Sequence, residues 1–140
     1  MPENPPAGTP RISPYLLYED ATAAVAWLSR AFGFVSDART TMRDGEGHVR
    51  HAELRYQEGV VMLGHPGPDY RSPRSTGHST VNVYVYVDDV DAHYRQAVEA
   101  GATVVEEPTD TPYGDRRYGA EDPEGHRWYF ATHVRDAPGA

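Results

Sequence analysis

The sequence predicts an α+β fold that consists of two tandem modules, each with the order strand, helix, strand, strand, strand. Three observations support this prediction. Strand-like and helix-like segments follow one another in the same order twice along the chain. Each helix-like segment begins after an acidic pair and ends at a glycine. Between the two copies, residues 65–79 are rich in Gly, Pro and Ser, which is typical of a linker.

The first module is expected to cover residues 11–64. Its first strand is predicted at residues 12–18. Asp20 is expected to cap the helix that follows, and Gly33 is expected to end it. Three more strands with turns between them are predicted at residues 35–42, 48–56 and 60–64.

The second module is expected to cover residues 80–135 and to begin with a strand at residues 80–87. Asp88 and Asp89 open its helix, which Gly101 ends. Four residues of this helix are expected to face the core: Val90, Tyr94, Ala97 and Val98. Three further strands are predicted at residues 103–108, 115–121 and 126–133.

The two copies align at Gly33 with Gly101 and at Glu58-Gly59 with Glu124-Gly125. A repeat of about 65–70 residues is too long for a solenoid unit and indicates a duplicated supersecondary module. A chain of 140 residues has the usual size of one domain, which we place at residues 11–135. The ends at residues 1–10 and 136–140 are expected to be flexible tails.

The composition limits the compartment and the partners. There is no cysteine, no basic and apolar leader at the N-terminus, and no apolar run long enough to span a bilayer, so we expect a cytoplasmic protein without a membrane partner. The net charge is −8, and the arginines are scattered between acidic residues. Nucleic acid is therefore not an expected partner, whereas the field weakly favours a cationic small molecule.

The paired modules, the helix ends "AFGF" and "EAGATV", and the turn-plus-strand "DPEGHRWYF" resemble the vicinal-oxygen-chelate superfamily, which includes glyoxalase I, bleomycin-resistance proteins and extradiol dioxygenases. The resemblance covers residues 11–133. It implies a curved, cup-shaped mixed sheet with the helices outside and a ligand held in the cup. It also implies a homodimer, since family members commonly pair.

Metal-dependent members of this family hold an ion through residues on the first and last strand of each module. Carrying these positions over gives Ser13, Leu63, Asn82 and Tyr129. None is a carboxylate or an imidazole, so this set does not suit a divalent cation, and we expect no metal and no other cofactor. An error in strand register would reopen the question, because His51 and Glu53 project from one face of the same strand and could act as ligands or as a catalytic base.

The alternation of strand side chains predicts which residues line the cup. We expect the ligand to contact the set Ser13, Tyr15, His51, Glu53, Leu63, Asn82, Tyr84, Tyr86, Arg127 and Tyr129. Each has a plainer interpretation: strand tyrosines often only cover a sheet, Arg127 could pair with a neighbouring carboxylate, and His51 with Glu53 could be a solvated strand face. The segment 113–119 could form the rim through Tyr113, Arg116 and Tyr118, or be a surface loop.

Two functions remain open. The first is a metal-independent protein that binds an aromatic or heterocyclic compound, as bleomycin-resistance relatives do, with antibiotic sequestration as the possible role. The second is a metal-dependent lyase, isomerase or dioxygenase of the same superfamily. No nucleophile motif and no phosphate-binding loop is present in the sequence.

Overall fold

The computed structural model describes residues 1–136. The chain forms two compact units, Met1–Ser72 and the part from Pro73 onward. The division lies inside the predicted linker 65–79. The predicted C-terminal tail lies, from residue 137 on, outside the described residues. No helix within residues 1–136 is both long and apolar enough to cross a membrane.

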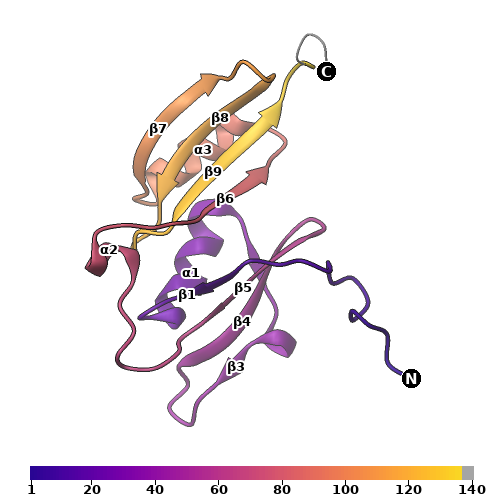
Figure 1. Ribbon diagram of the computed structural model, residues 1–140, viewed down its shortest axis with the longest axis vertical. Helices are drawn as coiled ribbons and strands as arrows, with labels where there is room; N and C mark the ends of the chain where they lie inside the picture. The colour runs from indigo at the N-terminus through magenta and orange to yellow at the C-terminus, as the bar shows by residue number, and fades with distance from the viewer. Residues whose placement is uncertain (137–140) are drawn as a thin grey trace. The chain divides into compact units, whose positions relative to one another are not determined.

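Unit one contains a mixed five-stranded sheet with one helix packed on it (Figure 1). β1 pairs in parallel with β5, and the other pairs are antiparallel. The strand order is β1-β5-β4-β2, with β3 also paired to β4. The elements are β1 (Tyr15–Leu17), α1 (Ala21–Phe32), β2 (Val35–Ser36), β3 (Met42–Arg43), β4 (Val49–Tyr56) and β5 (Gly59–Gly64).

The ends of α1 are where the sequence places them. The Asp20 carboxylate accepts a hydrogen bond from the backbone N–H of Ala23 at 3.0 Å, which caps the first turn. Gly33 ends the helix in the left-handed conformation with φ 81°, which glycine adopts without steric cost. The helix buries one face against the sheet, through Ala21, Ala24, Trp27, Leu28, Ala31 and Phe32.

The strand predicted at residues 35–42 is interrupted. A 3₁₀ helix, η1 (Ala38–Thr40), separates β2 from β3. Asp37 causes the break, because its side chain accepts from the backbone N–H of Arg39 at 2.8 Å and its carbonyl accepts from the hydroxyl of Thr41 at 2.7 Å. Such local bonds to an aspartate compete with strand pairing.

Unit two contains a four-stranded mixed sheet of order β6-β9-β8-β7, with β6 parallel to β9 and the other pairs antiparallel. Its helix α3 (Val90–Glu99) packs on one face of this sheet (Figure 1). The remaining elements are the short helix α2 (Pro73–Thr76) and the strands β6 (Asn82–Tyr86), β7 (Thr103–Asp110), β8 (Asp115–Glu121) and β9 (Arg127–His133).

The face of this sheet beneath α3 is the core of unit two. Trp128, Phe130 and Tyr118 are fully buried there, and the Tyr118 hydroxyl hydrogen-bonds Nδ1 of His93 on α3 at 2.5 Å. The expected inward position of Val98 is wrong, because this side chain is 44% exposed and His93 is buried instead. Burial of a histidine here is tolerated because the hydrogen bond to Tyr118 satisfies its ring.

Candidate functional site

The face of the β6–β9–β8 sheet that α3 does not cover carries a group of aromatic and charged side chains. The strand register places Asn82, Tyr84 and Tyr86 opposite Arg127, Tyr129 and Ala131. It also places Asp115 opposite His133, and Gly119 opposite Tyr129. Residues opposite one another project to the same side, so these side chains share one face. We call it the open face of unit two.

Asp115 is the centre of a hydrogen-bond cluster on this face. Its carboxylate is only 2% exposed. The hydroxyls of Tyr84 and Tyr86 donate to its Oδ2 at 2.7 and 2.9 Å, and His133 Nδ1 lies 2.8 Å from its Oδ1. The other ring nitrogen of His133 lies 2.8 Å from Oδ1 of Asp136. A buried carboxylate is thereby satisfied on both oxygens.

The pKa values of the cluster follow from these contacts. Burial alone would raise the pKa of Asp115, but the hydrogen bonds from His133, Tyr84 and Tyr86 hold it below its ordinary value. The contacts with Asp136 and then Asp115 raise the pKa of His133. Burial, followed by hydrogen bonds with Asp115 and Tyr113, raises the pKa of Tyr84. The hydrogen bond to Asp115 is the main cause that raises the pKa of Tyr86. At neutral pH the cluster therefore holds an ionised Asp115 and two neutral phenols.

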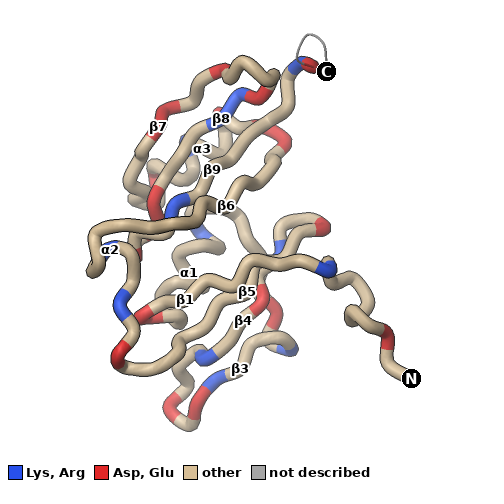
Figure 2. Tube along the Cα trace, in the orientation of Figure 1, with Lys and Arg blue, Asp and Glu red and all other residues tan. Residues whose placement is uncertain are grey.

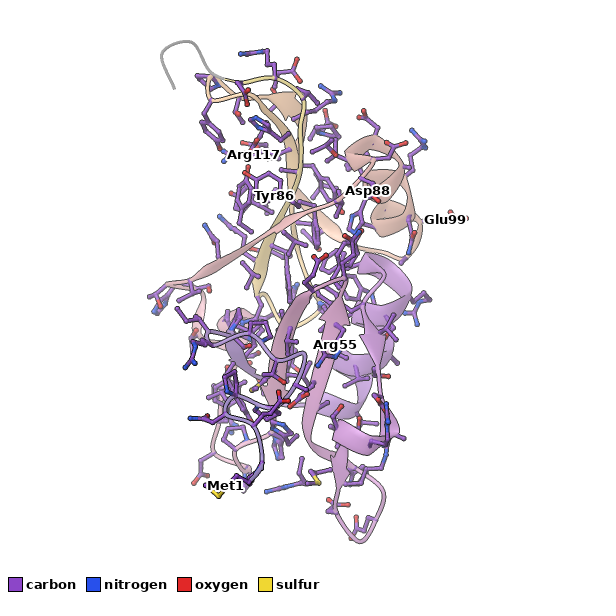
Figure 3. The ribbon with its side chains drawn as sticks, turned by 90° about the vertical axis from the view of Figure 1, so that its right-hand side faces the viewer. Met1, Arg55, Tyr86, Asp88, Glu99 and Arg117 are labelled. Carbon is purple, nitrogen blue, oxygen red and sulfur yellow. The ribbon has the colours of Figure 1, made fainter. Side chains whose placement is uncertain are left out.

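A second group on the open face is built around Tyr129. Its ring lies 6.5 Å from that of Tyr84, and the two are nearly parallel, at 18°. Cζ of Arg117 lies 5.0 Å from the centroid of the Tyr129 ring, within the range of a cation–π contact. The same guanidinium donates to Glu106 Oε1 at 2.8 Å and to the Tyr113 hydroxyl at 2.7 Å. In Figure 3, Tyr86 and Arg117 project from the same side of the sheet, away from α3.

Gly119 makes room for Tyr129. A Cβ atom at this position would lie 2.6 Å from Cε1 of Tyr129 and 2.8 Å from Cγ2 of Val105. Real side chains do not approach so closely, so the ring can lie over the backbone of β8 only because residue 119 has no side chain.

At the other end of this sheet the structure contains a cavity of about 460 Å³. Its lining includes the family position Asn82, together with Arg127 and Glu121. Arg127 donates to Glu121 at 2.9 Å, so the ion pair predicted as its plainer role is present. The lining is completed by a segment around α2 and the β8–β9 turn, namely Pro73, Arg74, Gly77, His78, Ser79 and Gly125.

Unit one has an open face of its own, on which Tyr15, Glu53 and Met62 lie side by side by register. The predicted pair His51 and Glu53 shares this face, as the alternation requires. The Tyr15 hydroxyl lies 2.8 Å from Nδ1 of His51, and the rings are 5.5 Å apart. One ring nitrogen of His51 is thus engaged in a hydrogen bond with Tyr15.

The prediction that Leu63 points to the open face is wrong. Leu63 is 0% exposed and lies opposite Leu16 and Ala52, whose side chains are also buried. Met62 takes the place on the open face, opposite Tyr15. The error comes from the turns, because the β4–β5 hairpin has two loop residues and the β8–β9 connection has five. Leu63 and Tyr129 each lie four residues after the glycine of their turn, Gly59 and Gly125, but they therefore project from opposite faces of their sheets.

With this correction, the positions expected from the family would be Ser13 and Met62 in unit one and Asn82 and Tyr129 in unit two. None of these side chains is a carboxylate or an imidazole, the usual protein ligands of zinc and iron. Ser13 lies before β1, and its Oγ is buried without a hydrogen-bond partner among residues 1–136. In the same part of the chain, no three His, Asp or Glu side chains are grouped so that they could hold a metal ion.

Two residues of the site were missed from the sequence, Asp115 and Arg117. The segment 115–121 was predicted as a strand and forms β8 (Asp115–Glu121), as expected, but residues 113–119 were considered only as a possible rim of the cup or as a surface loop. Of the expected rim residues, Tyr118 is buried in the core, and Arg116 pairs with Asp91 and Asp110. Tyr113, 46% exposed, is the one that joins the site. Strand alternation from Asp115 through Arg117 to Gly119 was the signal that could have found them.

The comparisons with known proteins agree with this architecture. The family model described as Glyoxalase/Bleomycin resistance protein/Dioxygenase superfamily matches residues 11–130. The crystal structure of TioX from Micromonospora sp. ML1 is 37% identical and has a TM-score of 0.71, and the match covers 89% of this chain and 99% of that one. A superfamily protein from Burkholderia phytofirmans PsJN shares the fold at 17% identity and a TM-score of 0.65, over 86% of this chain and 95% of that one.

Sequence similarity extends to mycobacteria. The chain is 36% identical to the uncharacterized protein Rv0887c of Mycobacterium tuberculosis over 132 residues, which are 91% of this chain and 76% of the relative. The match to the family model covers most of the chain. The chain belongs to the glyoxalase/bleomycin resistance protein/dioxygenase superfamily.

Proposed function

We propose that this protein is a metal-independent binding protein that captures an aromatic or heterocyclic small molecule. The observation that carries the proposal is the open face of unit two, where Tyr84, Tyr86 and Tyr129 are clustered around Asp115 and Arg117. Tyrosine rings offer flat apolar area to a planar ligand, and their hydroxyls fix its orientation. Tyr84 and Tyr86 are 39% and 58% exposed, so their rings are accessible to a ligand.

The types of side chain at the positions carried over from the family favour capture over metal-dependent chemistry. Ser13, Met62, Asn82 and Tyr129 supply no carboxylate and no imidazole, and His51 and Glu53 of unit one add only one of each. His51 is in addition hydrogen-bonded to Tyr15. Binding alone would suffice for sequestration of a toxic compound, such as an antibiotic, because a bound molecule is withdrawn from its target in proportion to the protein present.

Metal analysis and ligand binding on the same purified samples test this proposal. We expect less than a tenth of an equivalent of zinc, nickel, manganese or iron, and unchanged affinity for an aromatic probe after chelation. We expect Tyr129→Ala to weaken binding of a planar probe about tenfold, the loss typical of one stacked aromatic contact. A matched control is Tyr94→Phe, on α3 and outside the open face.

One equivalent of a transition metal that chelation removes together with binding would contradict the proposal and would favour the lyase, isomerase or dioxygenase alternative. Light scattering of the same samples is expected to give twice the chain mass of 15.5 kDa, the homodimer that we propose with this function. A monomer mass would contradict that part alone.

A further inference from the structure

Asp115 lies on the open face of unit two, and its side chain is almost fully buried. Its two oxygens lie within hydrogen-bond distance of three groups, the hydroxyls of Tyr84 and Tyr86 and the ring of His133. An ionised carboxylate can only accept hydrogen bonds. Each of the two tyrosines must therefore direct its single hydroxyl proton toward Asp115.

A third tyrosine, Tyr113, lies next to Arg117. Its oxygen accepts a hydrogen bond from Nη1 of Arg117 at 2.7 Å.

The hydroxyl oxygens of Tyr84 and Tyr86 keep free lone pairs, but neither keeps a free proton. Tyr86 is 58% exposed, so its lone pairs are accessible to a ligand. Arg117 directs Nε to Glu106 and Nη1 to Tyr113, and both ring nitrogens of His133 lie next to carboxylates. A molecule that approaches the hydroxyls of Tyr84 and Tyr86 therefore meets hydrogen-bond acceptors.

We propose that Asp115 is a positioning residue that sets ligand specificity: it draws the protons of Tyr84 and Tyr86 inward, so that this end of the open face accepts hydrogen bonds from a ligand with N–H or O–H donors on its aromatic edge. This inference rests on the proposed function, because it names the class of compound that the same face binds. Aromatic amines, phenols and heterocycles with a ring N–H belong to that class. Planar compounds whose edge carries only acceptors are disfavoured, because their lone pairs would face those of the tyrosines.

The proton arrangement can be tested without any ligand, by NMR of protein labelled with ¹³Cζ-tyrosine. Signals of Tyr84 and Tyr86, identified through Tyr84→Phe and Tyr86→Phe, should remain those of the neutral phenol as the pH passes about 10, where an ordinary tyrosine ionises. In Asp115→Leu both should ionise at lower pH than in the wild type. Ordinary titration of both tyrosines in the wild type would overturn the role of Asp115.

The ligand class can be tested with three probes of similar shape, indole as the N–H donor and benzofuran and quinoline as acceptors. We expect the wild type to bind indole about three- to tenfold more tightly than either acceptor probe, which is the range that one net hydrogen bond supplies. Asp115→Leu should lose this preference, and Asp115→Asn, which keeps one acceptor oxygen, should retain more of it. Tyr86→Phe removes only one exposed hydroxyl, so it reports on the preference even where Asp115→Leu does not fold.

The outcomes separate this inference from the proposed function. Equal binding of the three probes by the wild type, or the full indole preference in both Asp115→Leu and Tyr86→Phe, would overturn the donor specificity and leave capture of aromatics intact. No binding of any probe would contradict both. Tyr94→Phe serves as the control variant and should leave the preference unchanged.

Discussion

At the scale of single residues, the open face of unit two depends on two unusual choices, a buried carboxylate and a glycine. An isolated buried charge is costly, and it persists when surrounding donors satisfy it. Asp115 meets this condition through Tyr84, Tyr86 and His133. Gly119 contributes in a different way, since the space over its Cα is filled by the ring of Tyr129.

We predict that Gly119→Ala destabilises the protein by about 1–3 kcal/mol, the usual cost of forcing a methyl group into packed space. The new Cβ would otherwise lie 2.6 Å from the Tyr129 ring, so the ring has to move, and the affinity for a planar probe should fall as well. Urea denaturation and a binding titration measure the two effects.

Gly45→Ala is the matched control, because a Cβ there meets no atom within 4 Å and residue 45 has no positive φ. It should be neutral or slightly stabilising. The cost of Gly119→Ala should also shrink in a Tyr129→Ala background, since the clashing ring is then absent. An equal cost in both backgrounds would mean that Tyr129 is not the clashing group.

At the scale of elements, the same five-residue turn occurs twice, in positions that do not correspond between the units. In "DGEGH", Oδ1 of Asp44 accepts from the backbone N–H groups of Glu46 and His48 at 2.9 and 3.0 Å. In "DPEGH", Oδ1 of Asp122 accepts from those of Glu124 and His126 at 3.0 and 3.1 Å. The first turn joins β3 to β4, whereas the second joins β8 to β9.

These twin turns offer a matched pair of variants. Asp122 is 1% exposed, and its Oδ2 also accepts from the indole N–H of the buried Trp128 at 3.1 Å. Asp44 has no such partner among the bonds described. We predict a loss of about 3 kcal/mol in the free energy of unfolding for Asp122→Ala, against about 1 kcal/mol for Asp44→Ala, because removing the acceptor of a buried donor adds its desolvation cost. Denaturant titrations with near-ultraviolet circular dichroism of Trp128 measure both, and equal losses would contradict the role given to the indole bond.

The turns also explain how far the sequence determines the site. The sequence showed which strand residues of unit two face the core. Val83, Trp128 and Phe130 are apolar, and they alternate with the more polar Asn82, Tyr84 and Tyr129. The pattern in β5 is apolar on both faces, so only the turn could fix its register. The β4–β5 turn is shorter than the β8–β9 turn with which it was aligned, and this difference placed Leu63 on the open face. Asp115 was not predictable as a partner of Tyr84 and Tyr86, since that contact requires β6, β8 and β9 to be assembled.

At the scale of the whole molecule, the charge of −8 is distributed rather than gathered at the site. Figure 2 shows acidic residues on the strands and turns of both units, with arginines between them. On the open face of unit two the charges are paired locally, Arg117 with Glu106, Arg127 with Glu121 and His133 with Asp115. The acidic balance therefore acts on a ligand through the long-range field, which salt screens beyond about 8 Å at physiological ionic strength.

This distribution predicts how a ligand's charge affects binding. Quinoline and 1-methylquinolinium share a ring system and differ in charge, so their affinity ratio reports the electrostatic contribution. We expect the cation to bind about two- to threefold more tightly at low salt, and the ratio to approach one in about 0.5 M NaCl, where exposed charges are screened within a few ångströms. Isothermal titration at several salt concentrations measures the ratio. A large preference for the cation that persists at high salt would contradict the long-range interpretation, because only direct contact with the tyrosine faces escapes screening.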